Sequence, residues 1–521
     1  MHCKKAALVI NPRTGQNLAN LSDVLAVLAA AGWKTDIAIK EYGGHSMELA
    51  RQAAEDKSDL IIAYGGDGTV NQVINGVMNA RKQRGIVGVI PGGTANLWAG
   101  DIGTPSDPVL AALSLVNSEP RKVDIGLVSV QEITFPDGKR KAVKSSKKLI
   151  SKARHHFLLM AGLGLDAAVM SGVSKSLKYR VGPLAIGVSA ARELPAQSPF
   201  PIEIRAADDG GKDELLWQGE AVQIVVGNTR RYAIVLEMTP EAYIDDGILD
   251  VCVITGGDPL STIQQLSSLI LRRKPDNVNT EFFRGAHLSI RVPASVLLEL
   301  DGSFIKLKDY LSKADYEAIE QTHDKEHVMV TYRFDALPGA LNIAIPCTYD
   351  GDLFEHGAGH NGSHAHGEKQ SKAVHEQAEA QEKGGQPEQS PSQEHTLLHE
   401  TQPLSEEEAE KQSKGHAEEA KPLPELVSAL LERGRKVTIV GKTPNPDKPQ
   451  TFIIAGHTPK QLSGDNRPVA VVVNDKTDLF NRDGRRVSLA ALDEQLQTGA
   501  EIVVEGSKNR WGVISARRVV L

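Results

Sequence analysis

The chain has 521 residues, of which 24 % are charged and only 4 % aromatic, and its formal net charge is −7. This length exceeds what one hydrophobic core supports, so we expect two to four domains. The mildly acidic balance does not favour nucleic acid as the main partner. The three cysteines lie far apart without metal-binding spacing, which indicates thiols in a reducing, cytoplasmic compartment. The apolar runs are too short to predict a signal peptide or a membrane span.

Predicted strands and helices alternate through residues 1–125. Short apolar runs predict strands, and apolar residues three or four positions apart predict helices. The predicted strands are Ala6–Ile10, Ile37–Ile39, the run that begins at Leu60, and Gly85–Ile90. This alternation predicts a parallel sheet with helices on both faces. In such a sheet, ligands bind beyond the carboxyl ends of the strands.

Three of these strands end in turns that combine glycine with threonine or asparagine. The turns read NPRTG at residues 11–15, GGDGTVN at 65–71 and PGGTAN at 91–96. Glycine lets the backbone approach a phosphate closely, and the free N–H groups at a helix start attract anions. Asp67 lies inside the second turn, where a carboxylate could hold Mg²⁺ or take a proton from an attacking hydroxyl. One such turn also fits an ordinary strand–helix junction, but three together predict a phosphate site.

Residues 126–350 contain short β-like runs separated by turn residues, which predicts a β-sandwich. Two of its loops carry carboxylates, DDGILD at 245–250 and LELDGS at 298–303. By itself the DDG sequence is most typical of a plain turn. The lysines and arginines between residues 139 and 154 predict either a solvated loop or a patch for anionic lipid surfaces.

The last third of the chain divides into a linker and a small module. Residues 351–421 are rich in Glu, Gln, His, Gly and Ser, which predicts a disordered linker. Residues 422–521 show five strand-like runs with a short helical segment before the fourth, the order of an OB-like β-barrel. Trp511, Phe452, Arg517 and Arg518 could form a nucleic-acid face, but a single Trp is thin evidence for one. A protein partner or oligomerisation through this module is the other possibility.

The motifs GGDGTVNQVING and PGGTAN resemble the diacylglycerol kinase catalytic-domain family, bacterial lipid kinases that are related to sphingosine kinases. The resemblance covers roughly residues 5–347. It implies an ATP-binding domain at 1–125, a lipid-kinase β-sandwich domain at 126–350, and ATP and Mg²⁺ as cofactors. The implied substrate is a diacylglycerol-like or sphingoid lipid. The implied location is cytoplasmic, with peripheral association to the inner membrane face.

The resemblance also implies roles for individual residues. The residues implied to line ATP are Asn11, Pro12, Arg13, Thr14, Gly15, Gly65, Gly66, Asp67, Gly68, Thr69, Val70, Asn71 and Thr94. A structural Mg²⁺ would be held by the Asp246 carboxylate and the carbonyls of Tyr243 and Ile248, because hard cations prefer oxygen ligands. Three positions depart from the family, the first being Glu41, which stands where relatives often have Thr. Leu97 stands where many relatives have Asp, and Ser303 stands where the family usually has the Glu that serves as general base.

A serine cannot act as a general base at pH 7, so Asp67 and Asp301 are the candidate catalytic residues. Phosphoryl transfer depends more on positioning and charge neutralisation than on a strong base, which keeps kinase activity open. The alternative is a catalytically weak or inactive nucleotide- or lipid-binding regulator that signals through residues 422–521. An NAD or polyphosphate kinase-like activity shares the GGDGT turn, but the long β-rich domain with DDGILD argues against it.

Overall fold

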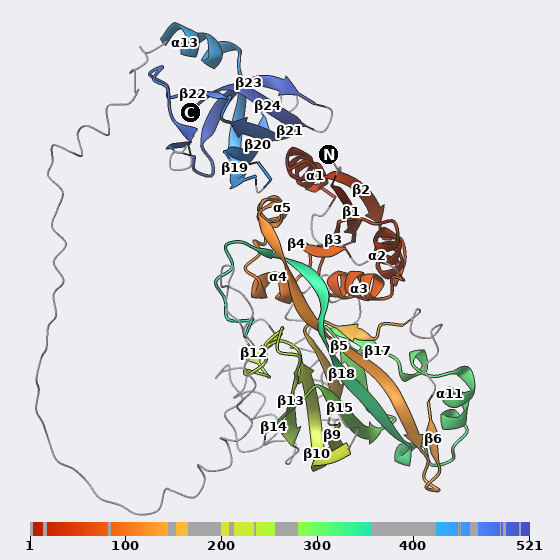
Figure 1. Cartoon of the computed structure of the whole chain (residues 1–521). Helices are drawn as coiled ribbons and strands as arrows, with labels where there is room; N and C mark the ends of the chain where they lie inside the picture. Colours follow the sequence, from red (N-terminus) through yellow and green to blue (C-terminus); the bar gives the residue numbers. More distant parts are fainter. Residues whose placement is uncertain are drawn as a thin grey trace, which may run out of the picture. The chain divides into compact units, whose positions relative to one another are not determined.

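Figure 1 shows the fold in a computed structural model of the chain. The structure describes residues 4–13, 18–81, 85–143, 153–164, 199–207, 213–233, 236–255, 280–355, 424–445, 447–448, 450–458, 467–489, 491–492, 496–509 and 512–521. Thr14 and Gly15, most of the predicted linker, part of the basic segment and Trp511 lie outside the described residues.

The first four strands form the predicted parallel sheet, in the order β2-β1-β3-β4. The strands are β1 (Lys5–Ile10), β2 (Lys34–Ile39), β3 (Leu60–Gly65) and β4 (Ile86–Pro91), and the helices are α1 (Leu21–Ala30), α2 (His45–Glu55), α3 (Asp67–Met78), α4 (Leu97–Asp101) and α5 (Pro108–Val116). All six residues of β3 are buried, as expected for a central strand that is covered on both faces. The parallel order brings the carboxyl ends of β1, β3 and β4 to one edge of the sheet.

The described residues between 118 and 346 form mainly antiparallel ladders, in agreement with the predicted β-rich domain (Figure 1). The strands are β5 (Ser118–Thr134), β6 (Arg140–Ala142), β7 (His156–Phe157), β8 (Met160–Gly164), β9 (Phe200–Ala207), β10 (Asp213–Gly227), β11 (Arg231–Ala233), β12 (Leu236–Glu237), β13 (Leu249–Thr255), β14 (Thr280–Gly285), β15 (His287–Pro293), β16 (Leu298–Leu300), β17 (Ser303–Ile305) and β18 (Met329–Pro346), with the helix α11 (Lys313–Glu320). β18 pairs with β5 and β15, and near its end it also pairs in parallel with β4. A mixed sheet therefore runs from one domain into the other, a continuity that the sequence did not predict.

The C-terminal module is a closed barrel of five strands, as predicted. Its elements are α13 (Pro424–Arg433), β19 (Arg435–Pro444), β20 (Thr451–Thr458), β21 (Arg467–Asn474), β22 (Asp478–Phe480), β23 (Glu501–Lys508) and β24 (Val513–Val520). The ladder β21-β20-β19-β23-β24 closes on itself because β21 also pairs in parallel with β24, and β22 adds to β24. Val437, Val471 and Ile514 are fully buried in its own core.

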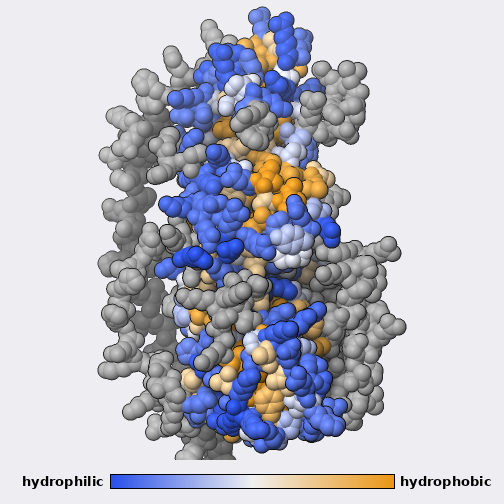
Figure 2. Space-filling model, turned by 90° about the vertical axis from the view of Figure 1, so that its right-hand side faces the viewer, coloured by the Kyte–Doolittle hydropathy of each residue, from blue (hydrophilic) through white to orange (hydrophobic). Residues whose placement is uncertain are grey.

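The surface of the described residues combines hydrophilic regions with apolar patches, as Figure 2 shows for one face. Edge strand β2 and its surroundings expose four large apolar side chains, Leu18, Ile37, Ile39 and Tyr42, each 45–51 % accessible. Within the part of the chain that the structure describes, no helix is both long and apolar enough to cross a membrane.

Candidate active site

The turns after β3 and β4 meet at the sheet edge. The Gly92 N–H donates to the Gly65 carbonyl at 3.0 Å, which fixes the two turns against each other. A Cβ atom on Gly93 would lie only 2.4 Å from the Gly66 Cα, so this approach requires a residue without a side chain. Asn11 joins them from β1, because its N–H donates to the carbonyl of Tyr64 in β3 at 3.0 Å. The predicted convergence is therefore present for the turns after β3 and β4 and for Asn11, whereas Thr14 and Gly15 of the first turn lie outside the described residues.

Only part of the predicted nucleotide-binding motif is accessible to a ligand. Gly66, Asp67 and Gly68 at the start of α3 are partly exposed, and Thr94 is exposed. The next three residues of the motif, Thr69, Val70 and Asn71, are buried. A helix start with accessible glycines is the place where an anion gains most from the helix dipole and the first-turn N–H groups.

Asp67 opens α3 and faces the turn after β4. The Trp98 N–H donates to its Oδ1 at 3.3 Å. Burial raises the pKa of the Asp67 carboxyl, against the lowering effect of this hydrogen bond, and the nearby Asp301 carboxyl raises the pKa further. Ser303 lies beside the same helix start, since a Cβ atom on Gly68 would lie 3.5 Å from its Oγ. The position that usually carries the family's glutamate thus adjoins the site.

Asp301 is fully engaged as a hydrogen-bond acceptor. Its Oδ2 accepts from Asn71 Nδ2 at 2.8 Å and from the Leu158 N–H at 2.9 Å. Its Oδ1 accepts from the N–H groups of Leu159 at 2.9 Å and Met160 at 3.0 Å. The residue is 4 % exposed and adopts a positive φ of 45° between β16 and β17. This geometry suits a clamp between α3 and the second domain better than a group that exchanges protons with a substrate.

Asn75 is a second clamp residue, which the sequence interpretation missed. Its Oδ1 accepts from the N–H groups of His155 and His156, both at 3.0 Å. Its Nδ2 donates to the His156 carbonyl at 2.9 Å, and Asn71 Nδ2 donates to the same carbonyl at 2.9 Å. The signal in the sequence was the spacing of four between Asn71 and Asn75, which places both amides on one face of α3.

Asp101 is a buried acid near Asp67 that the sequence interpretation also missed. It ends α4, one helical turn after Leu97, and only 6 % of its side chain is exposed. Burial raises the pKa of Asp101 to about 7, with Arg231 at 3.3 Å acting against that shift and Asp67 adding to it. The Asp101 carboxyl group thus lies one helical turn from residue 97, where this chain has Leu and many relatives have Asp.

The loop predicted to hold a structural Mg²⁺ has a different arrangement. Tyr243, Asp246 and Ile248 share one turn, but Asp246 Oδ1 accepts from the Ile248 N–H at 3.0 Å and Oδ2 accepts from Arg284 Nη2 at 2.8 Å. Burial raises the pKa of the neighbouring Asp250 to about 6, while Arg284 lowers it. In this arrangement the Asp246 carboxylate is paired with Arg284 and is not open to the predicted cation.

Comparison with known proteins gives matches to two family models. Residues 5–128 match the model of the diacylglycerol kinase catalytic domain, and residues 160–309 match that of the YegS C-terminal NAD kinase beta sandwich-like domain. A crystal structure from Bacillus anthracis str. Sterne aligns with 66 % of this chain and 96 % of its own, at 22 % identity and a TM-score of 0.48.

Curated relatives cover the same part of the chain. The diacylglycerol kinase of Bacillus subtilis (strain 168) is 28 % identical over 305 residues, which are 58 % of this chain and 90 % of that protein. The diacylglycerol kinase of Staphylococcus saprophyticus is 26 % identical over 321 residues, 59 % of this chain and 94 % of that protein. The glycine turns around Asp67 lie inside the matched catalytic domain. Residues 5–128, which contain these turns, therefore match the diacylglycerol kinase catalytic domain, and the curated relatives of that name resemble this chain over the same region.

Proposed function

We propose that the protein is an ATP-dependent kinase that transfers the γ-phosphate to a hydroxyl of a diacylglycerol-like or sphingoid lipid. The observation that carries this proposal is the meeting of the turns at 65–68 and 91–96 around Asp67, with residue 303 beside them. The names of the relatives support the kinase class and the lipid acceptor.

The triphosphate would bind at the start of α3, where Gly66 and Gly68 are partly exposed and the helix dipole favours negative charge. The Asp67 carboxylate would hold the Mg²⁺ that accompanies ATP. Bound Mg²⁺ neutralises charge on the transferring phosphoryl group. The lipid oxygen then forms its bond to the γ-phosphorus as the bond to the β–γ bridging oxygen breaks.

The chain lacks a carboxylate at residue 303 to take the proton of the lipid hydroxyl. In a loose transition state that proton leaves late, and a phosphate oxygen can accept it. Ser303 is compatible with this route, and Asp301 takes no part in it because its oxygens already accept four hydrogen bonds. We therefore assign Asp67 to the reacting groups and Asp301 to positioning α3.

The test is transfer of labelled γ-phosphate from ATP in mixed micelles that contain diacylglycerol, monoacylglycerol, ceramide or sphingosine. We expect a Mg²⁺-dependent phospholipid product that is lost in Asp67→Asn. The matched control is Asp56→Asn, an exposed carboxylate at the end of α2. Equal product from wild type and Asp67→Asn would refute the assignment.

A second candidate function is a regulator that binds nucleotide or lipid with little or no turnover. The observation in its favour is that Ser303 occupies the usual position of the general base while Asp301 is saturated by hydrogen bonds. Here ATP would raise the melting temperature without any labelled product. Ser303→Glu separates the two functions, because a restored base should raise turnover only if the remaining site is competent.

A lipid acceptor requires contact with a membrane surface. We propose that the exposed apolar side chains at β2 make this contact, since Leu18, Ile37, Ile39 and Tyr42 are about half exposed. The double variant Ile37→Glu/Ile39→Glu should then sediment less with phosphatidylglycerol vesicles than wild type does. Unchanged sedimentation would remove β2 from the contact surface.

A further inference from the structure

The turn at residues 245–248 is closed by an arginine from a neighbouring strand. Arg284 lies in β14 directly opposite Asp250 in the antiparallel ladder with β13. Its Nε donates to Asp250 Oδ1 at 2.8 Å, and its Nη2 donates to Asp246 Oδ2 at 2.8 Å. The guanidinium therefore links two carboxylates whose side chains are only 5–7 % exposed.

Guanidinium donors also engage the backbone oxygens that precede the turn. Arg284 Nη2 lies 3.4 Å from the Glu241 carbonyl, and Arg230 Nε donates to the Ala242 carbonyl at 3.0 Å. The Arg230 guanidinium lies over the ring of Tyr243, 4.7 Å from its centroid. Of the oxygens that a hard cation would use in this turn, arginine therefore engages the Asp246 carboxylate, the only charged ligand among them, and two carbonyls beside the turn.

Asp124 holds the turn from the other side and is equally engaged. Its Oδ2 accepts from the Gly247 N–H and its Oδ1 from the Gly339 N–H, both at 2.6 Å. Gly247 has a φ of 74°, a conformation that glycine adopts without strain. The turn thus has its backbone anchored by Asp124 and its two buried carboxylates bridged by one planar cation.

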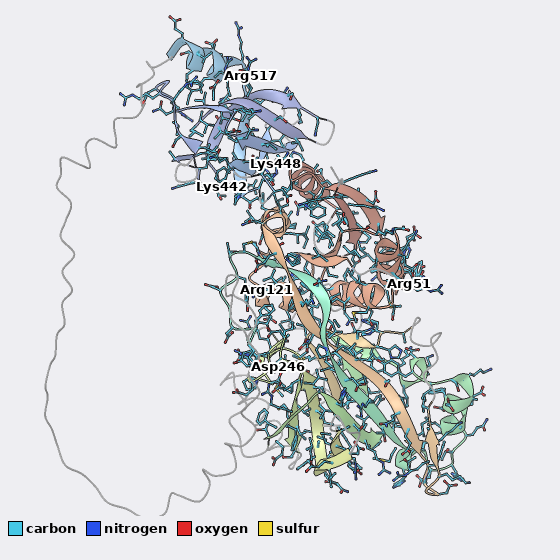
Figure 3. All side chains as sticks on the ribbon, viewed as in Figure 1. Arg51, Arg121, Asp246, Lys442, Lys448 and Arg517 are labelled. Atoms are coloured by element: carbon cyan, nitrogen blue, oxygen red, sulfur yellow. The ribbon has the colours of Figure 1, made fainter. Side chains whose placement is uncertain are left out.

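We propose that Arg284 takes the place of a divalent cation in this turn, so that residues 241–250 keep their fold without bound metal. Two buried carboxylates need a cation between them, and the guanidinium fork supplies one positive charge with donors aimed at both. Figure 3 labels Asp246 among the side chains of the second domain. The inference concerns the fold of this turn and does not depend on phosphoryl transfer.

The experiment measures thermal unfolding and metal content in the absence of nucleotide. Purified wild type should melt at the same temperature in EDTA and in excess Mg²⁺, and elemental analysis should find far less than one equivalent of tightly bound divalent metal. Arg284→Met keeps an unbranched apolar stem but leaves Asp246 and Asp250 without a cation. It should melt lower, and Mg²⁺ or Mn²⁺ should restore part of the loss.

Arg51→Met on α2 is the control, because Arg51 is 42 % exposed against 44 % for Arg284 and pairs with Glu55 at the surface (Figure 3). Arg284→Lys keeps the charge without the fork, so an intermediate melting temperature is expected. The proposal is overturned if wild type loses stability in EDTA and regains it with Mg²⁺, or carries one tightly bound equivalent. It is also overturned if Arg284→Met melts like Arg51→Met. Should Arg284→Met fail to fold, the wild-type and Arg284→Lys measurements still decide.

Discussion

Asp301→Ala should weaken the junction between α3 and the second domain. The substitution removes the acceptor of the N–H groups of Leu158, Leu159 and Met160, and of the Asn71 amide. A buried donor left without a partner costs about 1–3 kcal/mol of folding stability. For the three backbone donors together we expect a loss of about 3–6 kcal/mol, below the full sum because water that enters the vacated space offsets part of it. Such a loss is comparable with the whole stability of many domains.

Hydrogen exchange is the sharpest assay, because a chain of several domains need not unfold in two states. We expect the amides of residues 158–160 to exchange much faster in Asp301→Ala, and the urea midpoint to fall. Asp309→Ala, which changes an exposed carboxylate nearby, should leave both unchanged. Asn71→Ala should give a smaller loss, and its effect should not add fully to that of Asp301→Ala. Unchanged exchange at 158–160 in Asp301→Ala would refute the clamp.

Three further predictions concern buried groups and close contacts. Asp101→Asn should become more stable relative to wild type as the pH rises from 4 to 8, by up to about 4 kcal/mol. The reason is that the native Asp101 carboxyl keeps its proton up to a pKa of about 7, whereas the unfolded chain releases it near pH 4, so wild type loses stability over this range. Urea unfolding at both pH values measures the difference. Gly93→Ala should abolish the rise in melting temperature caused by ATP, since its Cβ would lie 2.4 Å from the Gly66 Cα. Gly126→Ala should cost about 1–3 kcal/mol in urea unfolding, because its Cβ would lie 2.1 Å from the Phe157 ring, and Phe157→Leu should relieve part of that cost.

The features that the sequence predicted well are those encoded by local patterns. The apolar runs and the glycine turns gave the parallel sheet and the meeting of the turns around Asp67, because connections in such a sheet are short and bring strand ends to one edge. The closed barrel followed from the order of five strand-like runs with a helical segment before the fourth. The sheet that the two domains share could not be predicted from such patterns. Ile343 pairs with Val87 across more than 250 intervening residues, and no periodicity in the sequence identifies such a distant partner.

The roles of individual carboxylates depend on such distant partners. In the sequence, Asp246 and Asp301 each precede a glycine in an acidic loop. These patterns predicted a metal ligand and a catalytic residue, respectively. In the structure, Arg284 and Asn71 arrive from other elements and satisfy them. Asp67 carries a similar sequence signal, yet it stays partly exposed at the start of α3 with a glycine on either side. The donors that the fold brings to a carboxylate therefore distinguish a structural role from the reactive role proposed for Asp67. Arg284→Met removes such a donor, and Asp301→Ala removes the carboxylate that the donors bind.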